Sequence, residues 1–213
     1  MATLSEVEEA LAVIAHALLH DSEPTSRADL WRNFTQPEAR AALQARVTLL
    51  HCTSQYPTRM EEVNLRSMAT LAGAFGLPVG YSDHTEGIHV PTAAVALGAR
   101  VIEKHLTTDR SLPGPDHAAS LEPGEFAAMV RAIRAISTAM GPGGKGPQPS
   151  EWNTREAARQ RLVATRDLTR GTILAADDLT TARAASGQLA MEYWDWIGRP
   201  CPRDTQAGEG LLP

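Results

Sequence analysis

Residues 78–105 read PVGYSDHTEGIHVPTAAVALGARVIEKH, and this stretch decides the fold. Apolar runs of strand character at 78–82 and 99–105 enclose a short helical pattern. Strands that alternate with helices at this spacing indicate right-handed βαβ units with parallel strands. A histidine, His84 or His105, stands where each run stops. Functional groups gather at the carboxyl ends of parallel strands, so we expect both imidazoles at one edge of the sheet.

The same alternation extends outward along the chain. Ser5 with Glu8, and Thr58 with Glu61, have the spacing of capping boxes that start helices. The stretch 21–45 is polar and loosely helical and contains two prolines, and we expect variable surface structure there. The other expected elements are a helix over 4–20, a buried strand over 46–53, a helix over 62–75, a short helix over 90–98 and a helix over 122–140.

Glycine and proline dominate residues 141–150, which read GPGGKGPQPS and can neither continue a helix nor enter a central strand. We therefore expect a first domain over 1–140, a Gly/Pro-rich linker over 141–153 and a second domain over 154–213. After a helical stretch, short runs of strand character separated by turns predict a compact, mostly β second domain.

Composition excludes several classes of function. The 213 residues are 43% hydrophobic, which is ample for a buried core. The net charge is −5 and no cluster of Lys and Arg is present, so we expect no nucleic-acid partner. No apolar stretch approaches the roughly 20 residues that cross a bilayer, and we expect no membrane association. The two cysteines lie far apart, which predicts reduced thiols in a cytoplasmic protein.

Period-2 geometry predicts four polar side chains on one face of the two strands. Alternate residues of a strand point the same way, so Ser82 shares a face with His84, and Glu103 with His105. Two neutral imidazoles with an acid and a hydroxyl suit a divalent cation that acts on an oxygen-rich substrate. The alternative, that each histidine is a hydrogen-bonded structural residue, stays open on the pattern alone.

Further candidate residues follow two of the strands. Extended chain after the first strand would place Ser54 and Tyr56 on one face, with Tyr56 either as a pocket wall or as an aromatic anchor of the turn. The loop 110–117 carries two prolines and a glycine, which lets it hold Asp116 over the strand ends with little loss of entropy. A solvated Asp116 in an ordinary stiff loop is the alternative.

Several of these segments resemble the N-acetylneuraminate (sialic acid) synthase family. The motifs are HCTSQYPT at 51–58, GYSDHTEG at 80–87, VIEKHLT at 101–107 and DRSLPGPDH at 109–117. The tail MEYWDWIGR at 191–199 is similar to that family's C-terminal SAF module, which is itself similar to type III antifreeze protein. The resemblance implies an α/β fold: the last three strands of a (β/α)8 TIM barrel, then a small, mostly β SAF domain.

The resemblance also implies roles for single residues. His84 and His105 would hold a divalent metal, Mn²⁺ or Mg²⁺, as the cofactor. Ser82 and Ser54 would contact phosphoenolpyruvate.

The acceptor site is implied in the same way. Tyr56 and Asp116 would bind the amino sugar, and Asp116 and Glu103 are the expected catalytic residues, Glu103 as an acid in the pocket. Arg183 would reach the acetamido group of the sugar from a partner subunit, which implies a domain-swapped homodimer for the full-length enzyme.

The implied reaction condenses phosphoenolpyruvate with N-acetylmannosamine or a related amino sugar to a nonulosonic acid. The enol carbon C3 attacks the sugar aldehyde, which the metal polarises, and phosphate leaves after water adds to C2. Two alternatives stay open: a noncatalytic carbohydrate-binding or dimerising remnant, and another metal-dependent barrel aldolase or hydrolase.

Length and charge predict that the chain is a part of such an enzyme. A complete barrel needs about 200 to 250 residues, whereas some 140 precede the linker. Phosphoenolpyruvate is strongly anionic, and the chain has neither a Gly-rich phosphate loop nor a basic cluster. We therefore expect a C-terminal fragment or a truncated gene product that does not catalyse the full reaction alone.

Overall fold

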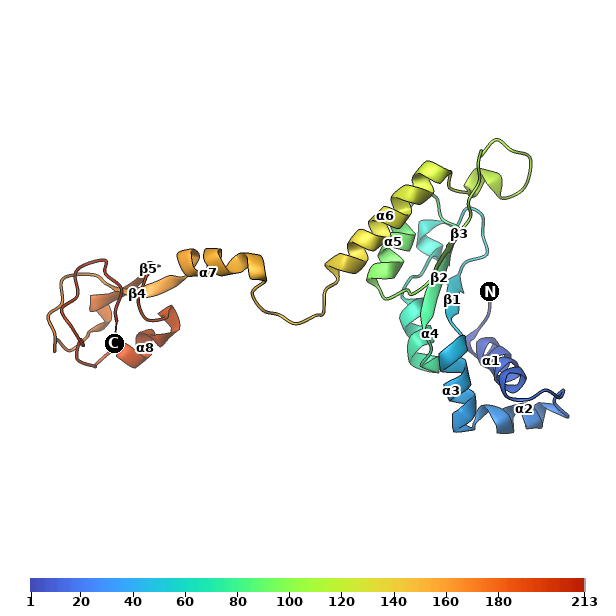
Figure 1. The fold of residues 1–213 in the computed structure, drawn as a ribbon, viewed down its shortest axis with the longest axis horizontal. Helices are drawn as coiled ribbons and strands as arrows, with labels where there is room; N and C mark the ends of the chain where they lie inside the picture. Colours follow the sequence, from blue (N-terminus) through green and yellow to red (C-terminus); the bar gives the residue numbers. More distant parts are fainter. Residues whose placement is uncertain (213) are drawn as a thin grey trace. The chain divides into compact units, whose positions relative to one another are not determined.

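The computed structural model describes residues 1–212, which form two compact units (Figure 1). Unit 1 spans Met1–Gly143, and unit 2 begins at Gly144 and includes the rest of the described residues. This division falls inside the range 141–153, where the sequence predicts a linker. None of the helices over residues 1–212 combines the length and the apolar character that a bilayer span requires.

Unit 1 contains a parallel three-stranded sheet with the strand order β1-β2-β3. The strands are β1 (Leu49–Cys52), β2 (Val79–Asp83) and β3 (Ile102–Lys104). In the register, Cys52 lies opposite Ser82, and Ser82 lies opposite Glu103. The predicted parallel pairing of successive strands is confirmed.

A helix follows each of these strands. The helices are α4 (Ser67–Phe75), α5 (His89–Ala96) and α6 (Pro123–Ala139). Helices α5 and α6 lie together on one side of the sheet (Figure 1). The core cluster that contains Val79 and Tyr81 of β2 draws its helical side chains from α4 and α5, among them Met68 and Ala94. Because side chains alternate along a strand, Gly80 and Ser82 face the opposite side.

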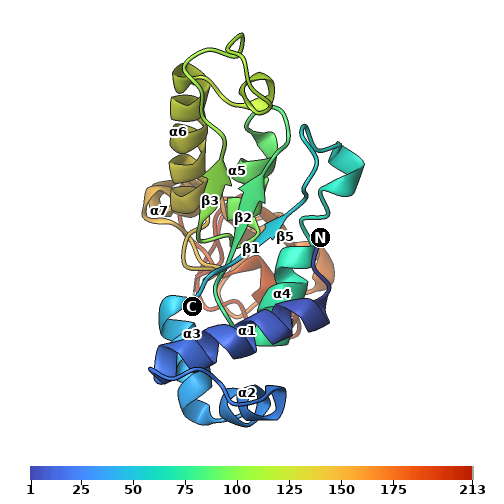
Figure 2. The same cartoon turned by 90° about the vertical axis from the view of Figure 1, so that its right-hand side faces the viewer.

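Three helices begin the chain: α1 (Leu4–Leu19), α2 (Arg27–Phe34) and α3 (Pro37–Arg46). The helical character predicted for 21–45 is confirmed, because α2 and α3 occupy most of it, but α3 is more than a surface excursion. Ala39 and Leu43 of α3 are buried against Leu11 and Ala15 of α1 in a second apolar core. Figure 2 shows α1 crossing beside α3.

Neither predicted capping box forms at the predicted residues. Thr3, not Ser5, caps α1: its backbone is extended, its Oγ1 accepts the Glu6 amide at 3.3 Å, and Glu6 Oε2 accepts the Thr3 amide at 2.7 Å. The Thr58 hydroxyl donates to the Gln55 carbonyl at 2.7 Å and caps no helix.

Two other predicted elements differ in detail. The helix over 62–75 is broken into a 3-10 turn η1 (Met60–Glu62) and α4, since Asn64 adopts a left-handed backbone with φ 45°. Strand β1 is half-buried rather than buried, because within the described residues it pairs along one edge only, with β2.

Unit 2 contains one antiparallel strand pair, β4 (Gln160–Ala164) with β5 (Leu179–Arg183). Isolated bridges, such as Val163 with Gly210, add to this pair. Its helical segments are η3 (Pro149–Glu151), α7 (Trp152–Ala158), η4 (Ala176–Asp178), η5 (Ala190–Glu192) and α8 (Tyr193–Trp196). Its core is a separate cluster that includes Leu162, Leu174 and Leu211. Regular strand pairing over 144–212 is thus limited to β4 and β5.

Candidate active site

The predicted polar face lies along β2 and β3, on the side away from the helical core. Ser82 and Glu103 are register partners, and the buried Ser82 hydroxyl donates to Glu103 Oε1 at 2.6 Å. This contact fixes the carboxylate of Glu103 on the sheet face. The two residues meet as the alternation of the strands predicts.

His84 follows β2 and is buried, with its ring oriented by the backbone of the chain after β1. Its Nδ1 lies 2.8 Å from the carbonyl oxygen of Thr53, and Cys52 Sγ lies 3.7 Å from the same nitrogen. A carbonyl oxygen only accepts, so Nδ1 carries a proton, and in the neutral imidazole Nε2 is the nitrogen with the lone pair. The ring can therefore bind a cation through Nε2 or accept a hydrogen bond from a substrate at the same nitrogen.

His105 follows β3, and its ring stands edge-on to that of His84. The ring centroids are 5.2 Å apart at an interplanar angle of 89°. Asp116 Oδ2 lies 3.9 Å from His105 Nδ1. The predicted meeting of the two histidines is confirmed as geometry.

Tyr56 covers the two imidazoles from the loop after β1. Its ring centroid is 4.0 Å from that of His84 and 5.6 Å from that of His105. Tyr56 therefore lies against both histidines, as a residue of the same site would. Tyr56 is nevertheless 44% exposed.

The loop after β3 holds Asp116 next to His105 through a set of internal bonds. Asp116 directly precedes a short 3-10 turn, η2 (His117–Ala119). The buried Thr107 hydroxyl is 2.8 Å from His117 Nδ1, and the Ser120 hydroxyl donates to the Asp116 carbonyl at 2.7 Å. Asp109, at the start of the loop, accepts the Ser111 hydroxyl and amide, which lowers the pKa of Asp109.

Two predicted site residues are not part of this cluster. Ser54 follows β1, is exposed, and makes no side-chain hydrogen bond to the residues above. Arg183 is the last residue of β5 in unit 2, where it pairs with Gln160.

Sequence reasoning missed the group on the opposite face of the same strands. Lys104 Nζ lies 2.7 Å from Asp83 Oδ2, and both side chains are buried. The signal was present in the sequence, because an acid and a base immediately precede the two histidines. The Thr53 carbonyl, by contrast, has no signal in the sequence, since every residue carries one.

The described residues offer two imidazoles to a metal at this site, and no further protein ligands are grouped with them. Over residues 1–212, no group of three or more His, Cys, Asp or Glu side chains is arranged to hold a metal ion. An ion at His84 and His105 would complete its coordination with water or substrate oxygens, and such open positions are typical of catalytic rather than structural metals.

Comparison with known families decides the relationship of the chain. The NeuB family model matches residues 1–145, and the SAF domain model matches residues 159–213. The chain belongs to the NeuB family. The resemblance to N-acetylneuraminate synthases that the motifs indicate is thereby confirmed, as are the mixed α/β class and the SAF domain.

Several relatives of this NeuB-family chain are synthases by name. It is 43% identical over 209 residues to N,N'-diacetyllegionaminic acid synthase of Campylobacter jejuni, covering 98% of this chain and 56% of that protein. It is 46% identical over 132 residues to human N-acetylneuraminate-9-phosphate synthase, covering 62% of this chain and 37% of that protein. The chain thus spans about half the length, or less, of these relatives.

Among solved structures, the chain resembles N-acetylneuraminic acid synthetase from Leptospira borgpetersenii, crystallised with citrate. The two are 35% identical with a TM-score of 0.53, over 69% of this chain and 52% of that one. The match again covers about half of the longer protein.

Proposed function

We propose that this chain is part of a synthase that condenses phosphoenolpyruvate with N-acetylmannosamine or a related amino sugar, forming a carbon–carbon bond and releasing phosphate. The observation that carries the proposal is the pair of imidazoles at the ends of β2 and β3, with the Ser82–Glu103 contact on the same face. The names of the relatives support this reaction class.

In this proposal, β1, β2 and β3 are the last three strands of a (β/α)8 barrel, and their open face is the barrel interior. Parallel strands followed by covering helices fit that architecture. Unit 2 is the mostly β SAF module. Both cysteines are free thiols, which fits the reducing cytoplasm in which we place the enzyme.

The donor set fits a divalent metal, Mn²⁺ or Mg²⁺. His84 would bind through Nε2, because Nδ1 is committed to the Thr53 carbonyl, and His105 would be the second ligand. When bound, the metal would supply Lewis-acid polarisation of the sugar aldehyde.

The other residues bind and orient the two substrates. Ser82 and Ser54 contact phosphoenolpyruvate, and Glu103, held by Ser82, is an acid in the pocket. Tyr56 forms the wall against which the acceptor sugar lies.

Asp116 binds sugar hydroxyls from the loop after β3, next to His105. Arg183 contributes from the SAF module of a partner subunit in a homodimer. Holding both substrates in reactive geometry supplies much of the rate enhancement.

Positive charge for phosphoenolpyruvate is the remaining requirement. Lys104 is neutralised by Asp83 on the far face of the sheet, so it is not available to the phosphate. We propose that cationic groups outside this chain complete the site in a longer synthase, and that the chain alone turns over poorly or not at all.

The test is phosphate release with phosphoenolpyruvate, N-acetylmannosamine and Mn²⁺, with the N-terminal part of a full-length relative supplied as a separate chain. We expect release that needs both substrates and that His84→Ala or His105→Ala abolishes. His20→Ala, at an exposed position after α1, is the matched control and retains activity. Sugar binding without turnover would support a binding remnant instead, and metal-dependent activity without phosphoenolpyruvate would support an aldolase or hydrolase.

A further inference from the structure

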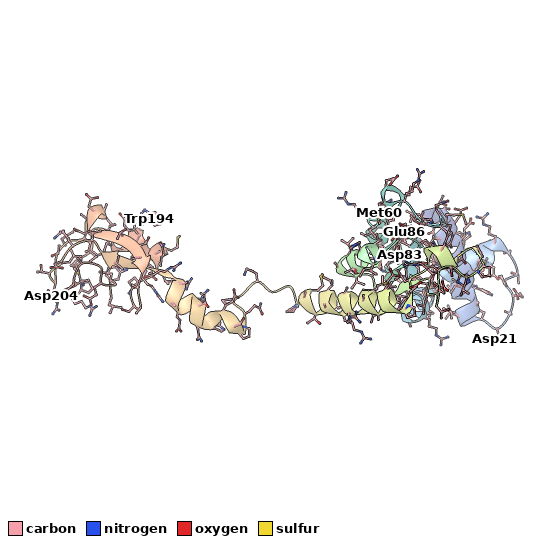
Figure 3. The ribbon with its side chains drawn as sticks, turned by 90° about the horizontal axis from the view of Figure 1, so that it is seen from above. Asp21, Met60, Asp83, Glu86, Trp194 and Asp204 are labelled. Atoms are coloured by element: carbon pink, nitrogen blue, oxygen red, sulfur yellow. The ribbon has the colours of Figure 1, made fainter. Side chains whose placement is uncertain are left out.

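A buried ion pair lies behind the candidate site, on the sheet face that the proposed chemistry does not use. Lys104 and Asp83 are register partners on β3 and β2, and each immediately precedes one of the two histidines. Their side chains are 1% and 0% exposed, with Nζ and Oδ2 2.7 Å apart. Figure 3 labels Asp83 within unit 1.

A contribution to folding stability is a poor explanation for the presence of this buried ion pair. Taking two charges out of water costs so much that well-packed apolar residues of similar volume are often as good or better for folding. A buried pair is better explained where it holds a particular geometry, and here the geometry next to it is that of the two histidines.

The hydrogen bonds of the pair involve the residues on both sides of His84. Lys104 Nζ donates to the carboxylate of Asp83 and also to the backbone carbonyl of Thr85. Asp83 Oδ1 in turn accepts the Thr85 amide at 3.0 Å and the Thr85 hydroxyl at 2.9 Å. The residues before and after His84 are therefore both tied to β3.

The ring of His84 is held from the other neighbour, because its Nδ1 donates to Thr53 after β1. His84 is thus fixed by the strands on either side of β2. Lys104 is covalently next to His105, so one side chain links the positions of both imidazoles.

We propose that the Lys104–Asp83 pair is a positioning device that sets His84 and His105 at the separation needed to share one cation. The inference rests on the proposed metal-dependent function of this site. It assigns no contact with substrate or metal to Lys104 or Asp83, which act through the histidines.

The test replaces both charges together, in the full chain, by apolar residues of similar size: Asp83→Leu with Lys104→Met. Co²⁺ titration, followed by its visible absorption, reports the affinity of the histidines. We expect binding 10- to 100-fold weaker than in the unmodified chain, the range typical when the groups that orient metal ligands are removed. Circular dichroism checks that the variant is folded. The control removes an exposed ion pair, Glu9→Leu with Arg27→Met, and leaves Co²⁺ affinity unchanged.

A second readout needs no metal. The Tyr56 and His84 rings, with centroids 4.0 Å apart, should give a nuclear Overhauser effect in the metal-free chain. We expect the double variant to lose it. A folded double variant that keeps both the Overhauser effect and the Co²⁺ affinity overturns the proposal. An unmodified chain that binds no Co²⁺, but whose Overhauser effect depends on the pair, refutes the metal function and leaves the positioning role standing.

If the double variant does not fold, Thr85→Val replaces it, since it keeps the side-chain shape and removes only the hydroxyl that donates to Asp83. We then expect Co²⁺ binding several-fold weaker, and unchanged binding together with an unchanged Overhauser effect overturns the proposal.

Discussion

Gly80 in β2 shows how closely the strands approach at a single residue. A Cβ built there would lie 2.5 Å from Leu50 Cδ2 and 2.5 Å from the Val101 carbonyl oxygen. The carbonyl belongs to the backbone that leads into β3, so it cannot move without opening the β2–β3 pairing. We expect Gly80→Ala to lower the free energy of unfolding by about 1–3 kcal/mol, the usual cost of overpacking, as measured by urea denaturation.

Gly73 in α4 is the matched control, because a Cβ there meets nothing within 4 Å. In a helix, Gly73→Ala should raise the free energy of unfolding by about 0.5–1 kcal/mol. Equal stability of the Gly80→Ala and unmodified proteins would show that the strands are farther apart than described.

Asp178 predicts a pH dependence in unit 2. Its carboxylate accepts the Ala175 amide at 2.9 Å and the Arg166 guanidinium at 2.7 Å, and the first of these bonds above all holds its pKa below the ordinary value. A lowered pKa in the folded state gives stability above the unfolded pKa that is lost as pH falls through the folded one. We expect Asp178→Asn to lower the Tm at pH 7, by an amount that shrinks below about pH 4. A Tm difference that is constant down to pH 2 would contradict this.

Much of the site could be predicted at the residue scale, because side chains alternate between the two faces of a pleated strand. Alternation fixes which strand residues share a face, so Ser82 had to lie near Glu103 once the strands paired. The partner of His84 could not be predicted, because only the path of the chain after β1 decides which carbonyl meets its ring. The burial of Lys104 depends on packing around the strand ends, which periodicity does not report.

At the scale of elements, sequence patterns predicted the βαβ series well, but they did not resolve the two helices α2 and α3 that precede it. Pro37 is one of the two prolines in the stretch 21–45, and it stands at the first position of α3, where a missing amide costs nothing. Ser26 caps α2 by accepting the Asp29 amide at 3.2 Å. Both signals are local and were in the sequence, but short polar helices gain their stability from tertiary packing, which a pattern search does not see.

The loop 105–121 is the element that presents Asp116, and Thr107 is its internal anchor. The Thr107 hydroxyl bonds to His117, the residue after Asp116. Thr107→Val removes this contact and also those of the same hydroxyl to the carbonyl and the amide of Asp109. We expect it to speed amide hydrogen exchange over 108–120 by about tenfold, since about 1.4 kcal/mol is a factor of ten in a local opening equilibrium. Thr138→Val is the control, because that hydroxyl bonds only within α6. Unchanged exchange in the Thr107 variant would mean that the prolines alone order the loop.

At the scale of the whole molecule, the division into two units was predictable because composition marks it. Seven of the ten residues at 141–150 are Gly or Pro, and no other stretch of the chain has that density. What composition could not report is where each core lies. Leu162 belongs to the core of unit 2, and Leu11 to a core of unit 1.

Because the two units have separate cores, we expect a smaller side chain in one core to destabilise that unit alone. Leu162 is 0% exposed and Leu11 is 1% exposed, so Leu162→Ala and Leu11→Ala are chemically identical changes at matched burial in different units. Each should cost about 2–5 kcal/mol of unfolding free energy, from lost transfer energy and the cavity left behind. In calorimetry of the full chain we expect two transitions, with each variant lowering the Tm of its own unit. If either variant lowers both transitions equally, the units unfold as one cooperative body, and the Gly/Pro-rich segment joins parts that depend on each other for stability.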